Sequence, residues 1–483
     1  MEQNHQPPER TELTGTGGLR DVLRVAVPLI LASSGHAIRL FADRIMLAWY
    51  SQEAISATMP AGLLNFTFMA FFIGTVGYTS AFVAQYIGAG RPREVGSVVW
   101  QGILLAVIGG VVVAFSALFA EQIFACMGHA PEVQAEEVRY FRILAVGSVS
   151  GIALPALTSF WSGRGKTRVV MGIELFCAAI NVVLNIALIF GKWGFPEWGI
   201  AGAAVGTCTS SFLGLLVGLA LFLTRENRAA FSTLPSPILD VSLLRRLIRF
   251  GLPNGMQFGL DLLAFNLFIA FLGTYGIVEL EAANIAFGLN AMAFIPITGL
   301  GIAISVLVGQ GIGAEDIAYS RRAVRSGFGI AVIYNGVVIA LYLGAPEAIV
   351  GIFAREGDAA QAESLIMAQQ CLKYIAAFLL LDAIAIVFGH AIRGAGDTYF
   401  SLVAGLVVSW GTLALPTFIA IRLDASFWTL WLILVIHVGL AAAVFFLRYL
   451  SGKWQDKRVI DGPSPGDPAA LAAECDLHAD RGI

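Results

Sequence analysis

Apolar stretches of about twenty residues recur along the whole chain and are separated by short polar breaks. A helix needs about 20 apolar residues to cross the hydrocarbon core of a bilayer. The pattern therefore predicts an all-α integral membrane protein with twelve transmembrane helices. We place the spans at 25–49, 60–87, 96–119, 137–161, 169–190, 199–224, 249–273, 282–311, 327–345, 368–392, 399–421 and 427–449.

The longest polar interruption between spans covers 225–246 and divides the twelve spans into two sets of six. We therefore predict two six-helix lobes joined by a linker. The tail that follows the last span is polar and contains proline, so we expect it to be loose. The predicted parts are a cytoplasmic N-terminal segment at 1–24, an N-lobe at 25–224, a cytoplasmic linker at 225–248, a C-lobe at 249–450 and a cytoplasmic tail at 451–483.

The composition agrees with a membrane protein and excludes several other classes. Hydrophobic residues make up 57% of the chain and charged residues 13%, and the mean hydropathy is +0.78. A soluble globular chain carries roughly 25% charged residues. A net charge of −3 excludes a basic nucleic-acid-binding surface. The five cysteines are scattered and form no CxxC pair, so they support neither a metal site nor a disulfide framework.

Lysine and arginine residues alternate between the two sides of the predicted spans. Of the 30 basic residues, 22 lie in the two tails and in alternate breaks, and six lie on the opposite side. Short loops rich in lysine and arginine stay in the cytoplasm, which places both termini there. The remaining two, Arg39 and Arg44, lie inside the first span.

The two halves of the chain repeat one another. At an offset of 225 residues, Gly74, Gln85 and Gly88 match Gly299, Gln310 and Gly313. The motif GxGxT at 163–167 recurs at 394–398, at an offset of 231. Because each half has an even number of spans, the lobes should have the same orientation and be related by a pseudo-twofold axis along the membrane normal. Chance similarity between apolar helices is the alternative, but it does not place polar and glycine positions in register.

Acidic residues inside predicted spans are the strongest functional candidates, because such groups normally face a cavity or a partner. Asp261 and Asp382 lie in the middle of spans seven and ten, with no basic residue close by in the sequence. Burial disfavours a charged carboxylate, so each can exchange a proton or bind a hard cation such as Na⁺. The alternative is that both are protonated acids that hydrogen-bond neighbouring helices.

The first span differs from spans seven and ten, because its acid, Asp43, has Arg39 and Arg44 close by in the sequence. Asp43 follows Arg39 by one helical turn, so one interpretation is a local ion pair that only neutralises the span. The other is that Asp43 faces the N-lobe cavity and changes partners during transport. A fourth acid, Glu174, is expected to be a solvated residue at the end of span five.

Neutral polar residues complete the N-lobe candidates. Asn181 and Asn185 are four residues apart, so both project from one face of span five, where they either line a pocket with Asp43 or bond another helix. His36 is the repeat equivalent of Asp261, which suggests a lining position, although a packing role is the alternative.

No part of the sequence supports catalysis or ATP binding. The segment GRGKT at 163–167 resembles the end of a phosphate-binding loop, but Phe160 occupies the place of the required first glycine and a membrane helix precedes it. We predict that the protein is not an enzyme and needs no cofactor. Its energy source should be an ion gradient.

Several segments resemble the multidrug and toxic compound extrusion (MATE) family over about residues 20–450. They are FADRIMLAWYSQEAISA, NVVLNIALIFGKWGFPEWGIAGAAVGT, GLPNGMQFGLD and LDAIAIVFGHAIRGAGDT. The resemblance implies a two-lobed antiporter that expels amphipathic cations in exchange for H⁺ or Na⁺.

The same resemblance implies roles for particular residues. It places Asp43, with Asn181 and Asn185, at the N-lobe acid site, and Asp261 and Asp382 at the C-lobe cation site of the sodium-coupled bacterial branch. The chain departs from the pattern where Asp261 replaces a glutamate, where Phe378 lacks a ligating hydroxyl, where Arg39 and Arg44 crowd Asp43, and where Asn185 replaces an acid found in some members.

The expectation is therefore a monomeric drug/cation antiporter of the bacterial inner membrane, whose partners are the lipid bilayer and an amphipathic, cationic small molecule. Asp261 and Asp382 would couple the ion, with Asp43 as a second site and Asn181, Asn185, His36 and Arg39 lining the N-lobe pocket. The alternatives are a flippase for a lipid-linked precursor, which would need a more basic cavity, and a membrane scaffold that transports nothing.

Overall fold

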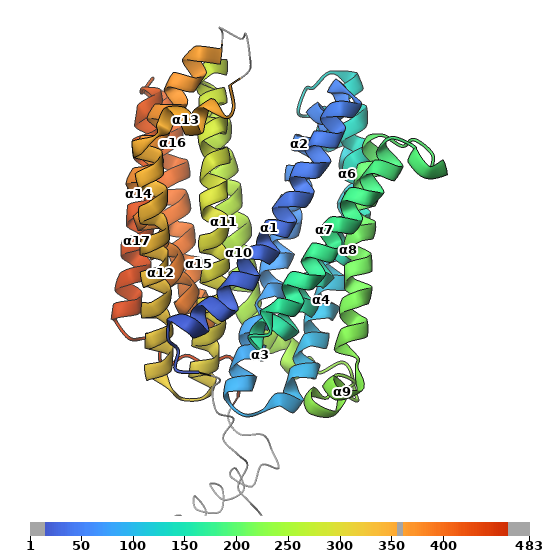
Figure 1. Ribbon diagram of the computed structural model, residues 1–483, viewed down its shortest axis with the longest axis vertical. Helices are drawn as coiled ribbons and strands as arrows, with labels where there is room; N and C mark the ends of the chain where they lie inside the picture. The colour runs from blue at the N-terminus through green and yellow to red at the C-terminus, as the bar shows by residue number, and fades with distance from the viewer. Residues whose placement is uncertain (1–14, 355–360, 462–483) are drawn as a thin grey trace, which may run out of the picture.

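The computed structural model describes residues 15–354 and 361–461, apart from the side chain of His36. The described residues form helices and no strand, and twelve helical segments are long and apolar enough to cross a membrane (Figure 1). The predicted fold class and the predicted number of spans are confirmed.

Six spans precede the central linker and six follow it. The N-lobe consists of α1 (Leu19–Tyr50), α2 (Gln52–Gly77), α3 (Thr79–Gly88), α4 (Val95–Phe115), α5 (Ala120–Ala125), α6 (Pro131–Gly163), α7 (Thr167–Ile189) and α8 (Ile200–Phe222). The C-lobe consists of α10 (Val241–Leu272), α11 (Ile277–Gly313), α12 (Ile317–Gly344), α13 (Pro346–Gly351), α14 (Gln361–Ala395), α15 (Thr398–Val408), the π-helical segment η4 (Ser409–Ala414), α16 (Leu415–Arg422) and α17 (Phe427–Leu450).

Several helices extend beyond the spans that hydropathy predicted. Helix α10 begins at Val241, although its span was predicted to begin at 249. Asp240 caps this helix, because its carboxylate accepts hydrogen bonds from the backbone N–H groups of Leu243 and Ser242, both at 3.0 Å. These bonds, with that of Leu243 first, hold the pKa of Asp240 below its usual range. Capped polar turns thus continue a helix outside its apolar stretch.

The central linker packs on the N-lobe and contains a short helix, α9 (Arg225–Phe231). The indole Nε1 of Trp100 donates a hydrogen bond to the carbonyl oxygen of Thr233 at 2.9 Å. The guanidinium of Arg164 lies 3.8 Å from the ring centre of Phe231, a cation–π contact. The linker is therefore held against the helices that it follows.

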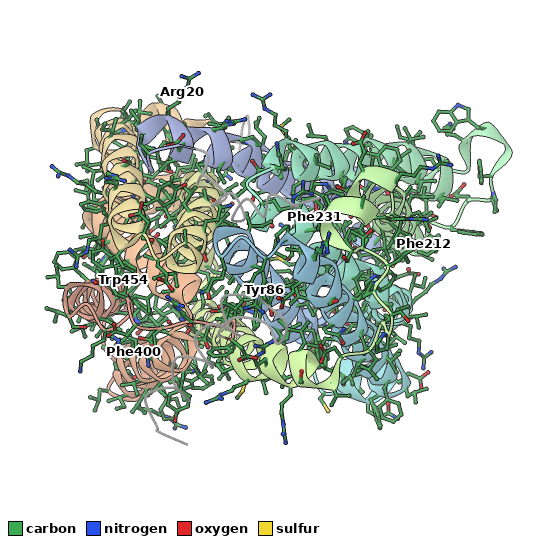
Figure 2. All side chains as sticks on the ribbon, turned by 90° about the horizontal axis from the view of Figure 1, so that it is seen from below. Arg20, Tyr86, Phe212, Phe231, Phe400 and Trp454 are labelled. Atoms are coloured by element: carbon green, nitrogen blue, oxygen red, sulfur yellow. The ribbon has the colours of Figure 1, made fainter. Side chains whose placement is uncertain are left out.

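The two lobes meet at one end of the molecule. In Figure 1 their helices come together at the bottom of the view and lean apart toward the top. The bottom carries the turns at 88–91, 163–166, 313–316 and 394–397. These turns lie on the side of the spans that holds most of the lysine and arginine residues, so we call it the basic end. Figure 2, which is seen from below, places Tyr86 near the middle of this face, with Trp454 on the C-lobe side and Phe231 on the N-lobe side.

Contacts between the lobes follow the sequence repeat. Helix α2 packs against α10, and α1 packs against α11. A Cβ atom added to Gly74 would lie 2.7 Å from the Cα of Gly255, and one added to Gly299 would lie 3.0 Å from the Cα of Ile30. At the offset of 225, Gly74 corresponds to Gly299 and Ile30 corresponds to Gly255, so the two contacts are equivalent in the repeat. The pseudo-twofold relation between the lobes is therefore present in their packing.

Two glutamines cross the lobe interface reciprocally at the basic end. The Nε2 of Gln85 donates to the carbonyl oxygens of Gly394 and Ala395 at 3.2 and 3.0 Å. The Nε2 of Gln310, its repeat equivalent, donates to the carbonyl oxygen of Gly163 at 2.9 Å. Each glutamine thus bonds backbone carbonyls at the end of a long helix in the other lobe, groups that have no partner within the helix itself.

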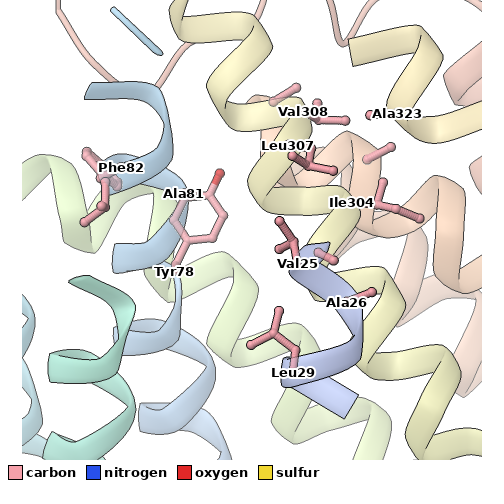
Figure 3. Close-up of a cluster of buried hydrophobic side chains, with 14 of the residues drawn as sticks. Val25, Ala26, Leu29, Tyr78, Ala81, Phe82, Ile304, Leu307, Val308 and Ala323 are labelled. Carbon is pink, nitrogen blue, oxygen red and sulfur yellow. The ribbon is translucent and has the colours of Figure 1, made fainter. Parts of the chain in front are cut away.

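Apolar side chains from both lobes also pack into one buried cluster. Those shown in Figure 3 come from α1, from α3 and the residue before it, and from α11 and α12. The labelled members in Figure 3 are Val25, Ala26, Leu29, Tyr78, Ala81, Phe82, Ile304, Leu307, Val308 and Ala323, all of them buried.

Because the lobes approach closely, we predict that two glycine positions cannot hold a larger side chain without strain. A Cβ at Gly88 would overlap the carbonyl oxygen of Gln310, and a Cβ at Gly313 would overlap that of Gln85. We expect Gly88→Ala and Gly313→Ala each to lower the free energy of unfolding by about 1–3 kcal/mol, the usual cost of overpacking. Thermal unfolding in detergent measures this change.

The matched controls are Gly172→Ala and Gly329→Ala, since both glycines lie within helices and an added Cβ would meet no atom within 4 Å. Alanine favours a helix over glycine by about 1 kcal/mol, so these variants should be as stable as the native chain or more so. Equal stability of all four variants would contradict the tight contact.

Candidate transport sites in the two lobes

The N-lobe site is centred on Asp43, which is almost fully buried in α1. Its Oδ1 accepts a hydrogen bond from the side-chain amide of Asn185 in α7. Its Oδ2 accepts one from the hydroxyl of Thr207 in α8 at 3.0 Å. The Nδ2 of Asn181 donates to the same hydroxyl at 3.2 Å. Residues from three helices therefore form one polar cluster.

The spacing on α7 explains why both asparagines reach this cluster. Residues 181 and 185 are one helical turn apart and share a face, and both are fully buried. Their Oδ1 atoms have no hydrogen-bond partner among the described residues. Amide and carboxylate oxygens are ligands of the kind that hard cations prefer.

Arg39 is oriented toward a different acid. Its Nη2 donates to Glu174 Oε2 at 3.0 Å, and its Nη1 donates to the hydroxyl of Ser211 at 3.4 Å. The Glu174 side chain is only 17% exposed, so the expectation of a solvated acid at a helix end was wrong. Arg39 still interacts electrostatically with Asp43, but Asp43 takes its hydrogen bonds from Asn185 and Thr207.

His36 was predicted to line the same pocket. Its backbone lies in α1, and its side chain is outside the described part of the structure. Its place in the pocket therefore stays a prediction.

The C-lobe contains a second acid with a hydroxyl partner. Asp261 in α10 accepts a hydrogen bond from the hydroxyl of Ser409 at 2.6 Å. Ser409 is the first residue of the π-helical segment η4 within span eleven. Such segments are rare and are frequent at functional sites. The side chains of Gln257 and Arg393 also interact with this carboxylate.

Arg393 lies in the last turn of α14 and is half-buried, although the sequence placed it in a loop. The helix continues past the predicted end of span ten at 392 and brings the guanidinium within electrostatic range of Asp261. This base therefore belongs to the surroundings of the C-lobe acid as well as to the basic end.

Asp382 lies on α14, three helical turns before Arg393, and is half-buried. Within residues 15–354 and 361–461, no hydrogen bond or ion pair reaches its carboxylate, and none joins it to Asp261. Both carboxylates lie on helices that pack against α15. A shared cation site for Asp261 and Asp382 stays a prediction.

Thr207 and Ser409 were not among the residues that the sequence selected. Each is a single hydroxyl in an apolar stretch, and neither its type nor its spacing distinguishes it from the other serines and threonines of the spans. The available signal was weak: Thr207 ends the segment GIAGAAVGT, and Ser409 follows two valines in span eleven.

Two lobes of six spans, with buried acids in each, define this chain as a multi-pass membrane protein of the two-lobed transporter class. Comparison with known proteins agrees. The model of the MatE family matches residues 28–187 and 253–417, one segment in each lobe. The chain belongs to the MatE family. This membership confirms the family resemblance and the prediction that the protein is a transporter and not an enzyme.

Relatives of similar length support the assignment. The chain is 29% identical over 462 residues to a probable multidrug resistance protein NorM of Pseudomonas putida, which covers 95% of this chain and 99% of that protein. It is 28% identical over 429 residues to the multidrug resistance protein NorM of Burkholderia vietnamiensis, at 87% and 88% coverage. Both matches span most of this chain and most of the relative.

Solved structures share the fold. An outward-facing multidrug resistance MATE family transporter of the MOP superfamily superposes with a TM-score of 0.83 at 20% identity, covering 94% of this chain and all of that one. A MOP superfamily transporter from Pyrococcus furiosus, for which a binding pocket of reversed polarity is described, gives a TM-score of 0.82 at 20% identity. At this identity, the likeness concerns the fold.

The hydrogen bonds of Asp43 predict that its hydroxyl partner stabilises the folded protein. We expect Thr207→Val to lower the free energy of unfolding by about 1.5–3 kcal/mol, because a bond to a charged group is lost while the side-chain shape is kept. Thermal unfolding at fixed pH measures this. Thr67→Val, which removes an exposed hydroxyl bonded to Leu63, is the control and should change the stability little. Equal losses in the two variants would argue against a special role for Thr207.

Proposed function

We propose that the protein is a secondary antiporter that exports amphipathic organic cations in exchange for inward H⁺ or Na⁺ by alternating access. In this proposal the basic end faces the cytoplasm, the host membrane is a bacterial inner membrane, and both termini are cytoplasmic. The excess of lysine and arginine in the loops of that end supports this orientation. Both lobes belong to one chain, so the transport path needs no second copy.

The observation that carries the proposal is the environment of Asp43. An acid inside a span is costly to insert, up to roughly 2.5–3.5 kcal/mol at the span centre, and such residues normally mark a functional site. Its carboxylate accepts hydrogen bonds from the neutral side chains of Asn185 and Thr207, and the same polar cluster contains the unpartnered Oδ1 atoms of Asn181 and Asn185. Such a site accepts a proton on the carboxylate or a dehydrated Na⁺ among the oxygens.

Exchange follows from competition for buried carboxylates. A coupling ion that neutralises an acid removes the negative charge that holds an organic cation, and the cation is released. The ion can drive this change only if it binds the two conformations of the transporter with different affinity. Asp261 and Asp382 supply further carboxylates for the same purpose in the C-lobe.

The class of substrate is supported by the relatives and by composition. The NorM relatives carry the name multidrug resistance protein. Aromatic residues make up 11% of this chain, with 33 phenylalanines, and apolar and aromatic side chains line most binding pockets for small organic molecules. Pairing of Arg39 with Glu174 neutralises the base that would have favoured an anionic, lipid-linked substrate.

Reconstituted vesicles test the proposal. The purified chain is placed in vesicles loaded with a fluorescent organic cation, and Na⁺ and H⁺ gradients are imposed separately. We expect one of the gradients to drive dye transport, and the double variant Asp261→Asn/Asp382→Asn to reduce it to the level of empty vesicles. Asp43→Asn should reduce it as well, because an amide carries no charge to exchange.

Glu347→Gln serves as the matched control, since it neutralises an exposed acid in the first turn of α13. It should transport like the native chain. Dye export at the native rate by the double variant would reject the C-lobe carboxylates as the coupling site, and no export by the native chain under either gradient would reject the antiport mechanism.

A further inference from the structure

The last described residues, 451–461, pack onto the basic end instead of forming the loose tail that the sequence predicted. We call this segment the C-terminal strap. Trp454 is fully buried, and its ring stacks on that of Tyr449 with the centroids 5.2 Å apart. Its Nε1 donates to the carbonyl oxygen of Tyr449 at 3.0 Å. The strap is therefore anchored to the end of α17, in the C-lobe.

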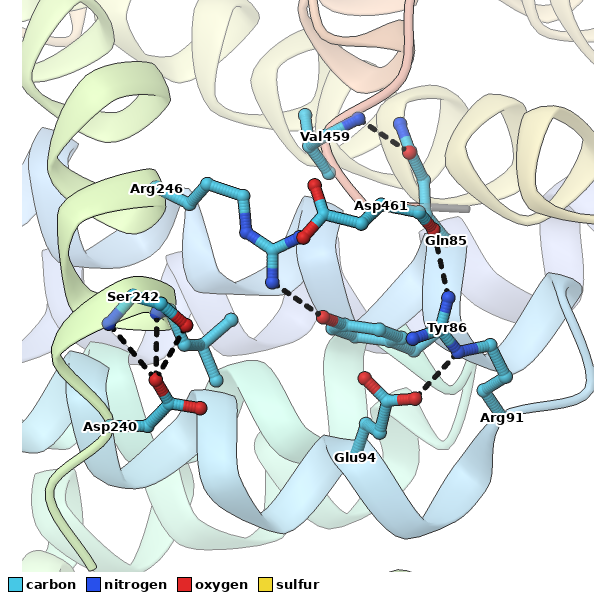
Figure 4. Close-up of polar contacts among 10 residues, drawn as sticks. Gln85, Tyr86, Arg91, Glu94, Asp240, Ser242, Arg246, Val459 and Asp461 are labelled. Carbon is cyan, nitrogen blue, oxygen red and sulfur yellow. Dashed lines mark hydrogen bonds and ion pairs between the residues drawn. The ribbon is translucent and has the colours of Figure 1, made fainter. Parts of the chain in front are cut away.

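From this anchor the strap crosses to the N-lobe. Val459 is 1% exposed, and its backbone N–H donates to Oε1 of Gln85 in α3 at 2.9 Å. This is the glutamine whose Nε2 bonds Gly394 and Ala395 across the lobe interface. Both ends of the Gln85 amide are thus bound to backbone groups of the C-lobe and of the strap, and Figure 4 shows the bond from Val459.

Charged groups hold the end of the strap. The carbonyl oxygen of Asp461 accepts a hydrogen bond from Nη1 of Arg91, in the loop after α3, at 2.8 Å. The Asp461 carboxylate forms an ion pair with Arg246 in α10, whose Nη2 also donates to the hydroxyl of Tyr86 at 3.3 Å (Figure 4). Behind them, Arg458 pairs with Glu315 in the C-lobe at 2.7 Å.

The strap breaks the symmetry of the repeat. Gln310 makes the reciprocal bond to Gly163, but among the described residues the hydrogen bonds of the strap reach Gln85 and not Gln310. The positions 225 residues earlier belong to the central linker, which packs on the N-lobe that it follows. The C-terminal strap therefore adds a bond between the lobes for which the described part of the central linker shows no equivalent.

We propose that the C-terminal strap is a latch that holds the lobes together at the basic end and must leave Gln85 and Arg91 before they separate there. The proposal rests on alternating access as proposed above, because that mechanism requires the basic end to open. Trp454 stays with the C-lobe in either state, so the strap can detach from the N-lobe without unfolding from its anchor. Its contacts favour the state that is closed at the basic end.

Distance measurements between spin labels test the latch in the full chain. Labels at Arg168→Cys in α7 and Arg325→Cys in α12, two exposed positions near the basic end of the two lobes, are introduced after the five native cysteines are replaced. Val459→Asp places a charge at the buried contact. We expect this charge to dislodge residue 459, so that its apolar contact and the bond from its backbone N–H to Gln85 are lost. The fraction of molecules with a long distance between the labels should then rise by about threefold or more.

Lys457→Gln is the matched control, because it makes the same change of charge at an exposed position of the strap. It should leave the distance distribution as in the native chain. A second set of variants guards against misfolding of Val459→Asp. Asp461→Arg and Arg246→Asp should each raise the fraction of long distances, because the ion pair with Arg246 of the C-lobe fixes the residue whose carbonyl oxygen bonds Arg91 of the N-lobe. The increase should be at most about fivefold, since the pair is partly exposed. The double swap should restore the native distribution.

The outcomes separate the latch from the transport function. Suppose that the native chain exports dye, and that Val459→Asp and both single charge variants show the native distribution of label distances. This result would overturn the latch and leave the antiport mechanism standing. Lengthened distances in these variants with recovery in the double swap would support the latch even if neither gradient drives export, in which case the antiport mechanism alone would fail.

Discussion

The structure depends on the contact between two repeat-related segments at the basic end, where α3 of one lobe meets the end of α11 of the other. Gly88 and Gly313 allow the backbones to touch, and Gln85 and Gln310 bond carbonyls of the opposite lobe. Side-chain amides suit this position, because each one satisfies orphaned backbone groups without bringing a charge into the interface. The two bundles are thereby joined at one end and diverge toward the other, which is the geometry that a two-lobed transporter needs.

Inside the lobes too, most polar contacts of the buried acids are made by neutral groups. In the N-lobe, Arg39 forms its ion pair with Glu174, and Asp43 takes its hydrogen bonds from the neutral amide of Asn185 and the hydroxyl of Thr207. In the C-lobe, Asp261 is bonded by Ser409, and Arg393 adds a positive charge from the basic end. The lobes are alike in fold but differ in the groups that face their acids.

The sequence predicted the membrane class, the number of spans, the two lobes and the repeat, because all of these depend on periodic features that a chain carries locally. Its errors have local causes too. Helix ends were misplaced because capped polar turns extend α10 past its apolar stretch. Glu174 was taken for a solvated acid, since its partner Arg39 is 135 residues away in the sequence. The whole tail was expected to be loose because its composition is polar, yet in its first part, 451–461, Trp454 and Val459 are buried; 462–483 lie outside the described residues.

What the sequence determined by itself is therefore the set of spans and the scarcity of charge that makes each intramembrane acid notable. The tertiary structure alone decided which groups face those acids: the hydroxyls of Thr207 and Ser409, the pairing of Arg39, and the docking of the strap on Gln85. Hydropathy and helical periodicity act within about one turn or one span, whereas a hydrogen bond between helices depends on their packing and rotation. Those follow from contacts of the whole bundle, which no single stretch of the chain encodes.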